Sequence, residues 1–402
     1  MIATQNAAGI SMNIVKNAQQ PANNAPQNAG RWCRCNTPVH LHNLKTEMDN
    51  LMKNIGILSL SFILIASCKQ QGSTNVAATI AHGKMPAVTK DANNRIHIIY
   101  GSGDKLMYTF SSDEGQTFAA PELVGGLPGL IASATRGPQI AATKNGIAVI
   151  AVNKDGDIFS YIKDQSGKWI ETGKVNDVDT TDKESFIGLS SDNENNLFAI
   201  WTDLRGDHQN KIFGARSSDG GKTWMKNILV YASPDGTICE CCKPSIAMNG
   251  KNVFVMFRNW LNGNRDLYLI QSCDGGESFG KAQKLGKGSW ALDGCPMDGG
   301  GMAVDNSGNV QTVWRREAKI YACEPGKEEK EIGEGKNCGM ENVNGKNIYT
   351  WTNNGVITCL LSDGSLKELG KGSSPVLKAA GNDKLLCVWE DDAEIKTALI
   401  RL

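Results

Sequence analysis

Ser217-Ser218-Asp219-Gly220-Gly221-Lys222-Thr223-Trp224 is the segment that decides the fold of this chain. Its aspartate can accept N–H hydrogen bonds from the backbone of its own turn, and its glycines can adopt backbone conformations that are closed to other residues. The final aromatic side chain can then pack against neighbouring elements. The same pattern occurs at residues 111–118 and 272–279, each time after a short apolar run. The chain therefore repeats one kind of tight turn between two strands.

Short runs rich in β-branched, aliphatic and aromatic residues recur along the chain, and a turn rich in Asn and Gly precedes each of them. The runs are 95–100, 146–151, 196–201, 252–257, 309–314, 347–351 and 384–389. Asn and Gly supply the positive φ of tight hairpin turns, so we expect another strand before each run and further strands after it. Antiparallel four-stranded units without a helical period predict an all-β fold, namely a β-propeller with four-stranded blades. We count seven blades, although six would also fit, and a β-sandwich is the structural alternative.

The last of these units lacks a fourth strand. Residues 75–80 could supply it and close the ring, which would remove the exposed sheet edges of an open stack. We therefore expect the propeller at residues 81–402 and a tether with a closing strand at residues 69–80.

The composition excludes some classes of function. The chain has 402 residues, with 42 Lys and Arg against 42 Asp and Glu. A protein without net positive charge lacks the electrostatic signature of nucleic-acid binding, so no nucleic-acid partner is expected. The 44 glycines agree with a turn-rich, all-β architecture.

Residues 52–68 have the pattern of a secretory signal. Met52-Lys53-Asn54 precede an apolar run, residues 55–66, which is too short to span about 30 Å of hydrocarbon as a helix. Leu64-Ile65-Ala66-Ser67-Cys68 resembles the lipobox of bacterial lipoproteins, in which the cysteine is lipidated. We expect an exported lipoprotein that is held to the bacterial envelope, periplasmic or on the cell surface, only through Cys68. An ordinary cleaved signal is the alternative, and residues 1–51 are expected to be a non-native upstream or disordered extension.

The three recurrent turns match the Asp box, or BNR repeat, and with it the chain resembles the sialidase (neuraminidase) superfamily over about residues 80–402. The resemblance implies that the Asp boxes are structural turns at the periphery and carry no chemistry. It also implies a ligand site on one face of the ring, which we call the mouth face. The links into the inner strands and the loops after the second strands meet there. A glycan is the implied partner, and an exo-α-sialidase type of glycoside hydrolase is the implied enzyme.

Candidate site residues follow from what a sialidase needs. Arginine clamps a substrate carboxylate with two parallel hydrogen bonds, and Arg136, Arg258 and Arg315 fall on the expected mouth face. Lys84 stands where the family places its first arginine. Asp203 and Asp298 are the candidate acids, whereas no tyrosine falls on a loop of this face. Charges at the rim or structural ion pairs are the alternative roles for these residues.

Cysteines also gather on the expected mouth face, on three consecutive links into inner strands. They are Cys239, Cys241, Cys242, Cys295 and Cys338. Three interpretations stay open: structural disulfides, a soft-metal site for copper or zinc, and a reactive or redox thiol. The function we expect first is glycan binding, with hydrolysis as a further step. A propeller that carries such a cysteine site without hydrolysis, or one that serves as a docking platform for proteins, is the alternative.

Overall fold

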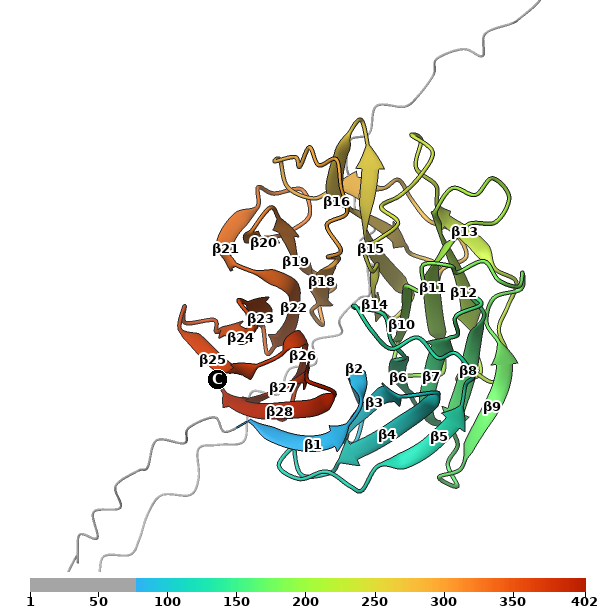
Figure 1. Cartoon of the computed structure of the whole chain (residues 1–402), viewed down its shortest axis with the longest axis vertical. Helices are drawn as coiled ribbons and strands as arrows, with labels where there is room; N and C mark the ends of the chain where they lie inside the picture. The colour runs from blue at the N-terminus through green and yellow to red at the C-terminus, as the bar shows by residue number, and fades with distance from the viewer. Residues whose placement is uncertain (1–76) are drawn as a thin grey trace, which may run out of the picture. The chain divides into compact units, whose positions relative to one another are not determined.

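The computed structural model describes residues 77–402, which form seven four-stranded antiparallel sheets arranged around a central axis (Figure 1). The prediction of a seven-bladed β-propeller is therefore confirmed. Among these residues, no helix is long and apolar enough to cross a membrane. Residues 1–76, which include the expected signal, the lipobox and Cys68, lie outside the described residues.

Each sheet contributes one strand to each of four concentric layers. The inner strands are β2 (Lys84–Lys90), β6 (Gln139–Thr143), β10 (Ile187–Ser191), β14 (Ser245–Asn249), β18 (Gly300–Val304), β22 (Lys336–Val343) and β26 (Ser373–Ala379). The second strands are β3 (Ile96–Ser102), β7 (Gly146–Val152), β11 (Leu197–Asp203), β15 (Asn252–Leu261), β19 (Val310–Arg316), β23 (Lys346–Asn353) and β27 (Lys384–Asp391). The third strands are β4 (Lys105–Ser111), β8 (Ile158–Lys163), β12 (Lys211–Ser217), β16 (Asn264–Ser272), β20 (Lys319–Cys323), β24 (Val356–Leu360) and β28 (Glu394–Arg401). The outer strands are β5 (Glu122–Gly126), β9 (Trp169–Lys174), β13 (Ile228–Tyr231), β17 (Gln283–Lys284), β21 (Lys330–Glu334), β25 (Leu366–Lys371) and β1 (Ala78–His82).

The ring closes by joining the two ends of the described chain in one sheet. The outer strand β1 pairs antiparallel with β28, so that Ala78 lies opposite Thr397 and His82 opposite Glu394. The closing strand thus begins and ends a few residues later than the expected 75–80. Each inner strand also contacts the next, and β2 contacts β26 across the closure. No blade edge is left open at the seam, which limits pairing with other chains.

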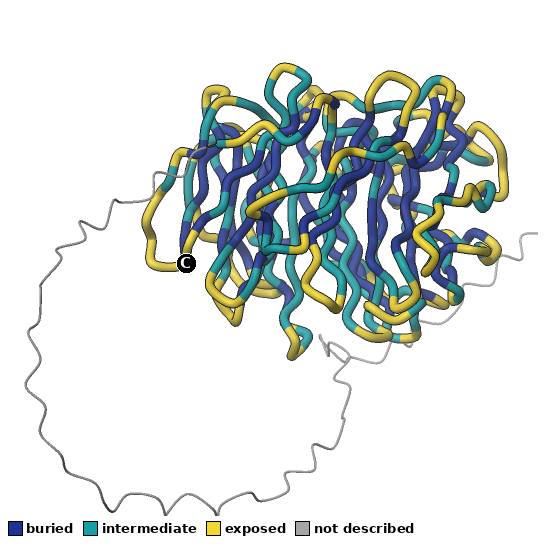
Figure 2. The backbone as a smooth tube through the Cα atoms, turned by 90° about the horizontal axis from the view of Figure 1, so that it is seen from below, coloured by how far each residue is buried: buried dark blue, intermediate teal, exposed yellow. Residues whose placement is uncertain are grey.

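The hydrophobic core lies between adjacent blades. The second strands are the most deeply buried, and every residue of β11 is buried. One cluster packs Ala148 and Ile150 of one blade against Leu197 and Trp201 of the next. Figure 2 shows buried stretches along the middle of the strands and exposed loops at the two faces of the ring. Because the core is shared between neighbours, the blades hold the mouth loops in fixed positions.

The Asp boxes form the turns that the sequence predicts, between third and outer strands. In the box that follows β12, Asp219 Oδ1 accepts the N–H groups of Lys222 and Thr223, both at 3.0 Å. Gly221 has a φ of 89°, and a Cβ atom there would lie 3.3 Å from the Cβ of Ala148 in the preceding blade. The box therefore closes its own turn and also fits it against the adjacent blade.

Candidate functional site

The links into the inner strands surround one cavity on the mouth face. It encloses about 280 Å³ and is lined from all of the inner strands or the links before them. Backbone passes close to backbone here, since a Cβ atom on Gly299 would lie 2.2 Å from the carbonyl oxygen of Lys243. A Cβ atom on Gly301 would lie 3.0 Å from the Cα of Gly339. Glycine therefore allows neighbouring inner strands, and the links before them, to approach closely around the cavity.

Lys243 is the cation of this cavity. Its Nζ donates a hydrogen bond to Gln139 Oε1 at 3.1 Å, across the ring from the link before β14 to the start of β6. Burial lowers the pKa of Lys243 to about 8, because the ammonium form loses hydration inside the ring. Sequence reasoning missed both residues. Lys243 directly follows the cysteine motif, but nothing local shows that its side chain reaches the cavity.

Asp298, one of the two candidate acids, is the carboxylate that lines the same cavity. It is buried, and its Oδ2 accepts the N–H of Asn337 at 3.0 Å. The same oxygen lies 3.6 Å from Arg315 Nη1. Burial raises the pKa of Asp298, and the two neighbouring donors oppose that shift. The structure thus brings Asp298 and Arg315 together, from the link before β18 and from β19 of the same blade.

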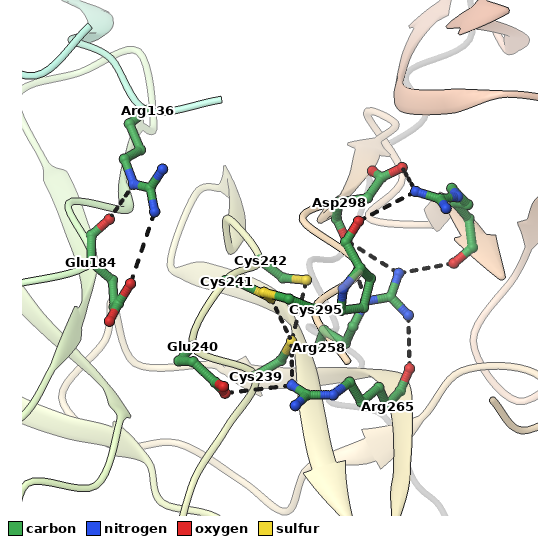
Figure 3. The surroundings of a disulfide bond; sticks show 12 residues. Arg136, Glu184, Cys239, Glu240, Cys241, Cys242, Arg258, Arg265, Cys295 and Asp298 are labelled. Atoms are coloured by element: carbon green, nitrogen blue, oxygen red, sulfur yellow. Dashed lines mark hydrogen bonds and ion pairs between the residues drawn. A yellow bond between two sulfur atoms is a disulfide. The ribbon is translucent and has the colours of Figure 1, made fainter. Parts of the chain in front are cut away.

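Arg258 lies beneath Asp298 and is only 1% exposed. Its guanidinium donates Nε and Nη2 to the carbonyl oxygen of Asp298, both at 3.2 Å. Nη1 donates to the carbonyl of Arg265 at 2.7 Å, and Nη2 also donates to that of Arg315 at 2.9 Å. Figure 3 shows the contacts of Arg258 with Asp298 and Arg265. The guanidinium of Arg258 therefore holds three backbone segments together. Arg258 is thus a positioning residue.

Three further candidates lie outside the cavity lining. Arg136 donates Nε to the carbonyl of Glu184 at 2.6 Å and stacks over Phe186. Asp203 is fully buried, and its carboxylate accepts Trp201 Nε1 at 2.8 Å and Arg205 Nε at 3.0 Å. Lys84 is exposed at the start of β2.

Four cysteines of the mouth face form a compact group, which Figure 3 shows: Cys239, Cys241, Cys242 and Cys295. Cys241 and Cys295 form a disulfide between the links that precede β14 and β18. Cys239 Sγ lies 3.3 Å from Cys242 Sγ and 3.6 Å from Cys241 Sγ. The sulfurs of Cys239, Cys241 and Cys242 all lie within 4.8 Å of one another, close enough for ligands of one metal ion.

The two free thiols of this group have different environments. The hydrogen bond with Cys242 and the nearby Arg265 lower the pKa of Cys239 to about 7, despite its burial. Burial raises the pKa of Cys242 well above its usual value. Arg265 Nη1 lies 3.1 Å from Cys239 Sγ, a contact that sequence reasoning missed because Arg265 follows a hairpin turn. Cys338 is buried and lines the cavity from within β22, so the expectation that it lies on a link is wrong.

Comparisons with known proteins agree with the fold. No protein-family model matches the chain, and no curated protein matches it. Among solved structures, the chain is similar to the BP39L lectin of Burkholderia pseudomallei, with 11% identity over 81% of this chain and 97% of the lectin and a TM-score of 0.56. It is also similar to the alpha-L-arabinanase of Penicillium chrysogenum, with 12% identity, 81% and 98% coverage and a TM-score of 0.47.

A third similar structure is the NanB sialidase of Streptococcus pneumoniae. The identity is 12%, the alignment covers 81% of this chain and 69% of the sialidase chain, and the TM-score is 0.43. The chain is a seven-bladed β-propeller, and the lectin, at 11% identity, is similar to it in fold alone.

Proposed function

We propose that this protein binds a carbohydrate that carries a carboxylate, in the cavity on the mouth face. The observation that carries the proposal is the Lys243 ammonium, because Gln139 Oε1 is the one acceptor that the described residues offer it. An ammonium has three N–H donors, so two are left for a ligand. A sugar carboxylate would accept from them, and Asn337 with the backbone of the links would bond hydroxyl groups.

Binding without hydrolysis is the form of the proposal that the cavity supports. Glycoside hydrolysis of the usual kind needs two carboxyl groups, and the sialidase variant needs a tyrosine nucleophile. Among the described residues that line the cavity, Asp298 is the one carboxylate and none is a tyrosine. Arg258 donates its hydrogen bonds to backbone carbonyls, and Asp203 forms an ion pair with Arg205. Asp298 is then a hydrogen-bonding group for ligand hydroxyls.

The fold is compatible with this proposal. The lectin to which the chain is similar shows that a propeller of this shape serves as a carbohydrate-binding scaffold in another protein. We also propose, from the three Asp boxes, that the protein is a member of the sialidase superfamily. A site built from the links of many blades can hold a ligand with little rearrangement, which favours binding.

A glycan array tests the proposal. Fluorescently labelled protein is applied to acidic and neutral glycans, together with Lys243→Gln and the surface variant Lys144→Gln. Lys144 is exposed and pairs with Glu194 away from the cavity. We expect binding to glycans with terminal sialic or uronic acids, lost in Lys243→Gln and kept in Lys144→Gln. Equal binding by both variants would contradict the role of Lys243, and no binding to any acidic glycan would contradict the function.

We further propose that the protein is exported and anchored by lipid at Cys68, on the strength of the lipobox-like sequence that ends there. Metabolic labelling with a fatty acid, in a bacterial host that makes lipoproteins, tests the anchor. Label should enter the wild-type protein and be absent from Cys68→Ala. Equal labelling of both, or of neither, would contradict the proposal.

A further inference from the structure

Two cysteine pairs lie in contact on the mouth face, one oxidised and one reduced. Cys241 and Cys295 form the disulfide, whereas Cys239 and Cys242 are free thiols. The spacing of the free pair is Cys-x-x-Cys, with Glu240 and Cys241 between the two thiols. The short link before β14 therefore carries a dithiol and one half of a disulfide within four consecutive residues.

We propose that these four cysteines form a thiol–disulfide exchange centre, in which the disulfide moves between the Cys241–Cys295 pair and the Cys239–Cys242 pair. The proposal does not depend on carbohydrate binding. It rests on sulfur positions, because Cys239 Sγ lies 3.6 Å from Cys241 Sγ and 3.3 Å from Cys242 Sγ. One sulfur is thus placed next to both the disulfide that it would attack and the thiol that would complete the exchange.

The exchange balances without an outside oxidant. The Cys239 thiolate attacks Cys241 Sγ, a Cys239–Cys241 bond forms, and the bond to Cys295 breaks with its electron pair leaving on Cys295 Sγ. The Cys242 thiol then loses its proton and attacks Cys239 Sγ, and Cys241 leaves as a thiolate. The proton from Cys242 passes through solvent to the Cys295 thiolate. One disulfide and one dithiol have exchanged places, with no net change in electrons or protons.

Arg265 supplies a positive charge at the attacking sulfur. Its Nη1 lies 3.1 Å from Cys239 Sγ, and its guanidinium stacks on the Trp260 ring at 4.4 Å. Glu240 Oε2 lies 3.4 Å from the same nitrogen and holds it from the other side. Arg265 is thus a positioning residue that keeps a cation beside Cys239. A cation next to a cysteine favours the thiolate, which is the reactive form.

Solvent exposure differs between Cys295 and the Cys239–Cys242 pair of the exchange centre. Cys295 is exposed, whereas Cys239 and Cys242 are 0% and 2% exposed. An external thiol or disulfide can therefore reach the Cys295 side, and the buried dithiol can exchange with it only through Cys241. The Cys241–Cys295 disulfide is thus accessible from the surface, whereas the buried Cys239–Cys242 dithiol can reduce it from the interior. A purely structural disulfide needs no second thiol pair in contact with it.

Disulfide mapping tests the proposal in the intact protein. The protein is equilibrated over a series of dithiothreitol ratios, reduced to oxidised, quenched in acid and alkylated. Cleavage after Glu240 separates Cys239 from Cys241, and fragmentation mass spectrometry then assigns each linkage. We expect wild-type protein to show both the Cys241–Cys295 and the Cys239–Cys242 linkages. Wild-type protein that shows only Cys241–Cys295 at every ratio would overturn the proposal.

Two variants isolate the steps. In Cys242→Ser the exchange should stop at a Cys239–Cys241 linkage, with Cys295 alkylated, whereas Cys239→Ser should keep only Cys241–Cys295. Cys323→Ser is the matched control, because that thiol bonds backbone carbonyls of its own loop at 3.1 and 3.4 Å. It should behave as wild type. A native protein whose Cys239 and Cys242 are protected by bound copper or zinc, and become reactive after chelation, would overturn the exchange and favour a metal site.

Discussion

The disulfide from Cys241 to Cys295 ties together the links into two neighbouring blades, across 54 residues of sequence. Their Cα atoms are 6.1 Å apart, so the bond fixes the spacing of the mouth loops before β14 and β18. The double variant Cys241→Ala/Cys295→Ala should lower the free energy of unfolding by about 2–5 kcal/mol, since the unfolded chain regains the freedom of a long loop. Urea denaturation measures the loss. Unchanged stability would show that the links are held without the bond.

Arg258 should matter for stability. Substitution by Gln removes charged donors from the buried carbonyls of Asp298, Arg265 and Arg315, and hydrogen bonds from charged groups contribute about 1.5–3 kcal/mol each. We expect Arg258→Gln to lose more than about 3 kcal/mol in urea denaturation. Arg216→Gln, which breaks an exposed pair with Glu277, should lose under about 1 kcal/mol. Equal losses in the two variants would contradict the positioning role of Arg258.

Ligand affinity should depend on pH through Lys243. Its pKa is lowered to about 8, so the cation is present below that pH and is lost as pH rises through it. Calorimetric titration with an acidic sugar should therefore show affinity that is constant near pH 7 and falls by about tenfold per pH unit well above pH 8. Lys243→Arg should remove that fall, because arginine stays protonated. A flat profile in the wild-type protein would mean that another group binds the anion.

Acid should destabilise the protein through His97. Burial lowers the pKa of His97 to about 4, and the Tyr108 hydroxyl lies 2.6 Å from its Nδ1. Between pH 6.5 and 4 the unfolded state binds the proton and the folded state does not. Stability contributed by the neutral ring is therefore present above pH 6.5 and is lost as pH falls toward 4, by at most about 1.4 kcal/mol per pH unit.

Urea denaturation at pH 7, 6, 5 and 4 measures this loss. His97→Gln removes the titrating group, so its stability should fall less steeply over the same range than that of the wild-type protein. Parallel curves for the two proteins would show that other groups cause the acid effect.

The blades could be predicted from the sequence because their signals are local. Asp219 accepts the N–H groups of Lys222 and Thr223, three and four residues later, so the turn is specified by its own residues. Sequence position also places a link on the mouth face, because strand direction alternates within each blade. The gathering of Asp298, Arg315 and the cysteines on one face follows from that alternation.

The roles of the site residues could not be predicted, because they depend on contacts between blades. Arg258 and Lys243 both lie near the mouth, but one bonds backbone carbonyls beneath Asp298 and the other reaches Gln139 across the cavity. No local pattern distinguishes these side-chain directions. Likewise, the pairing of Cys241 with Cys295 depends on how two consecutive blades meet.

A matched pair of ligands tests the central claim most directly. Isothermal titration calorimetry at pH 7 compares a sialic or uronic acid glycoside with its methyl ester, which has the same shape without the charge. We predict that wild-type protein binds the acid at least about tenfold more tightly than the ester, a difference of about 1.4 kcal/mol, and that Lys243→Gln binds the two equally. Equal affinity for acid and ester in the wild-type protein, or the same preference for the acid in Lys243→Gln, would contradict it.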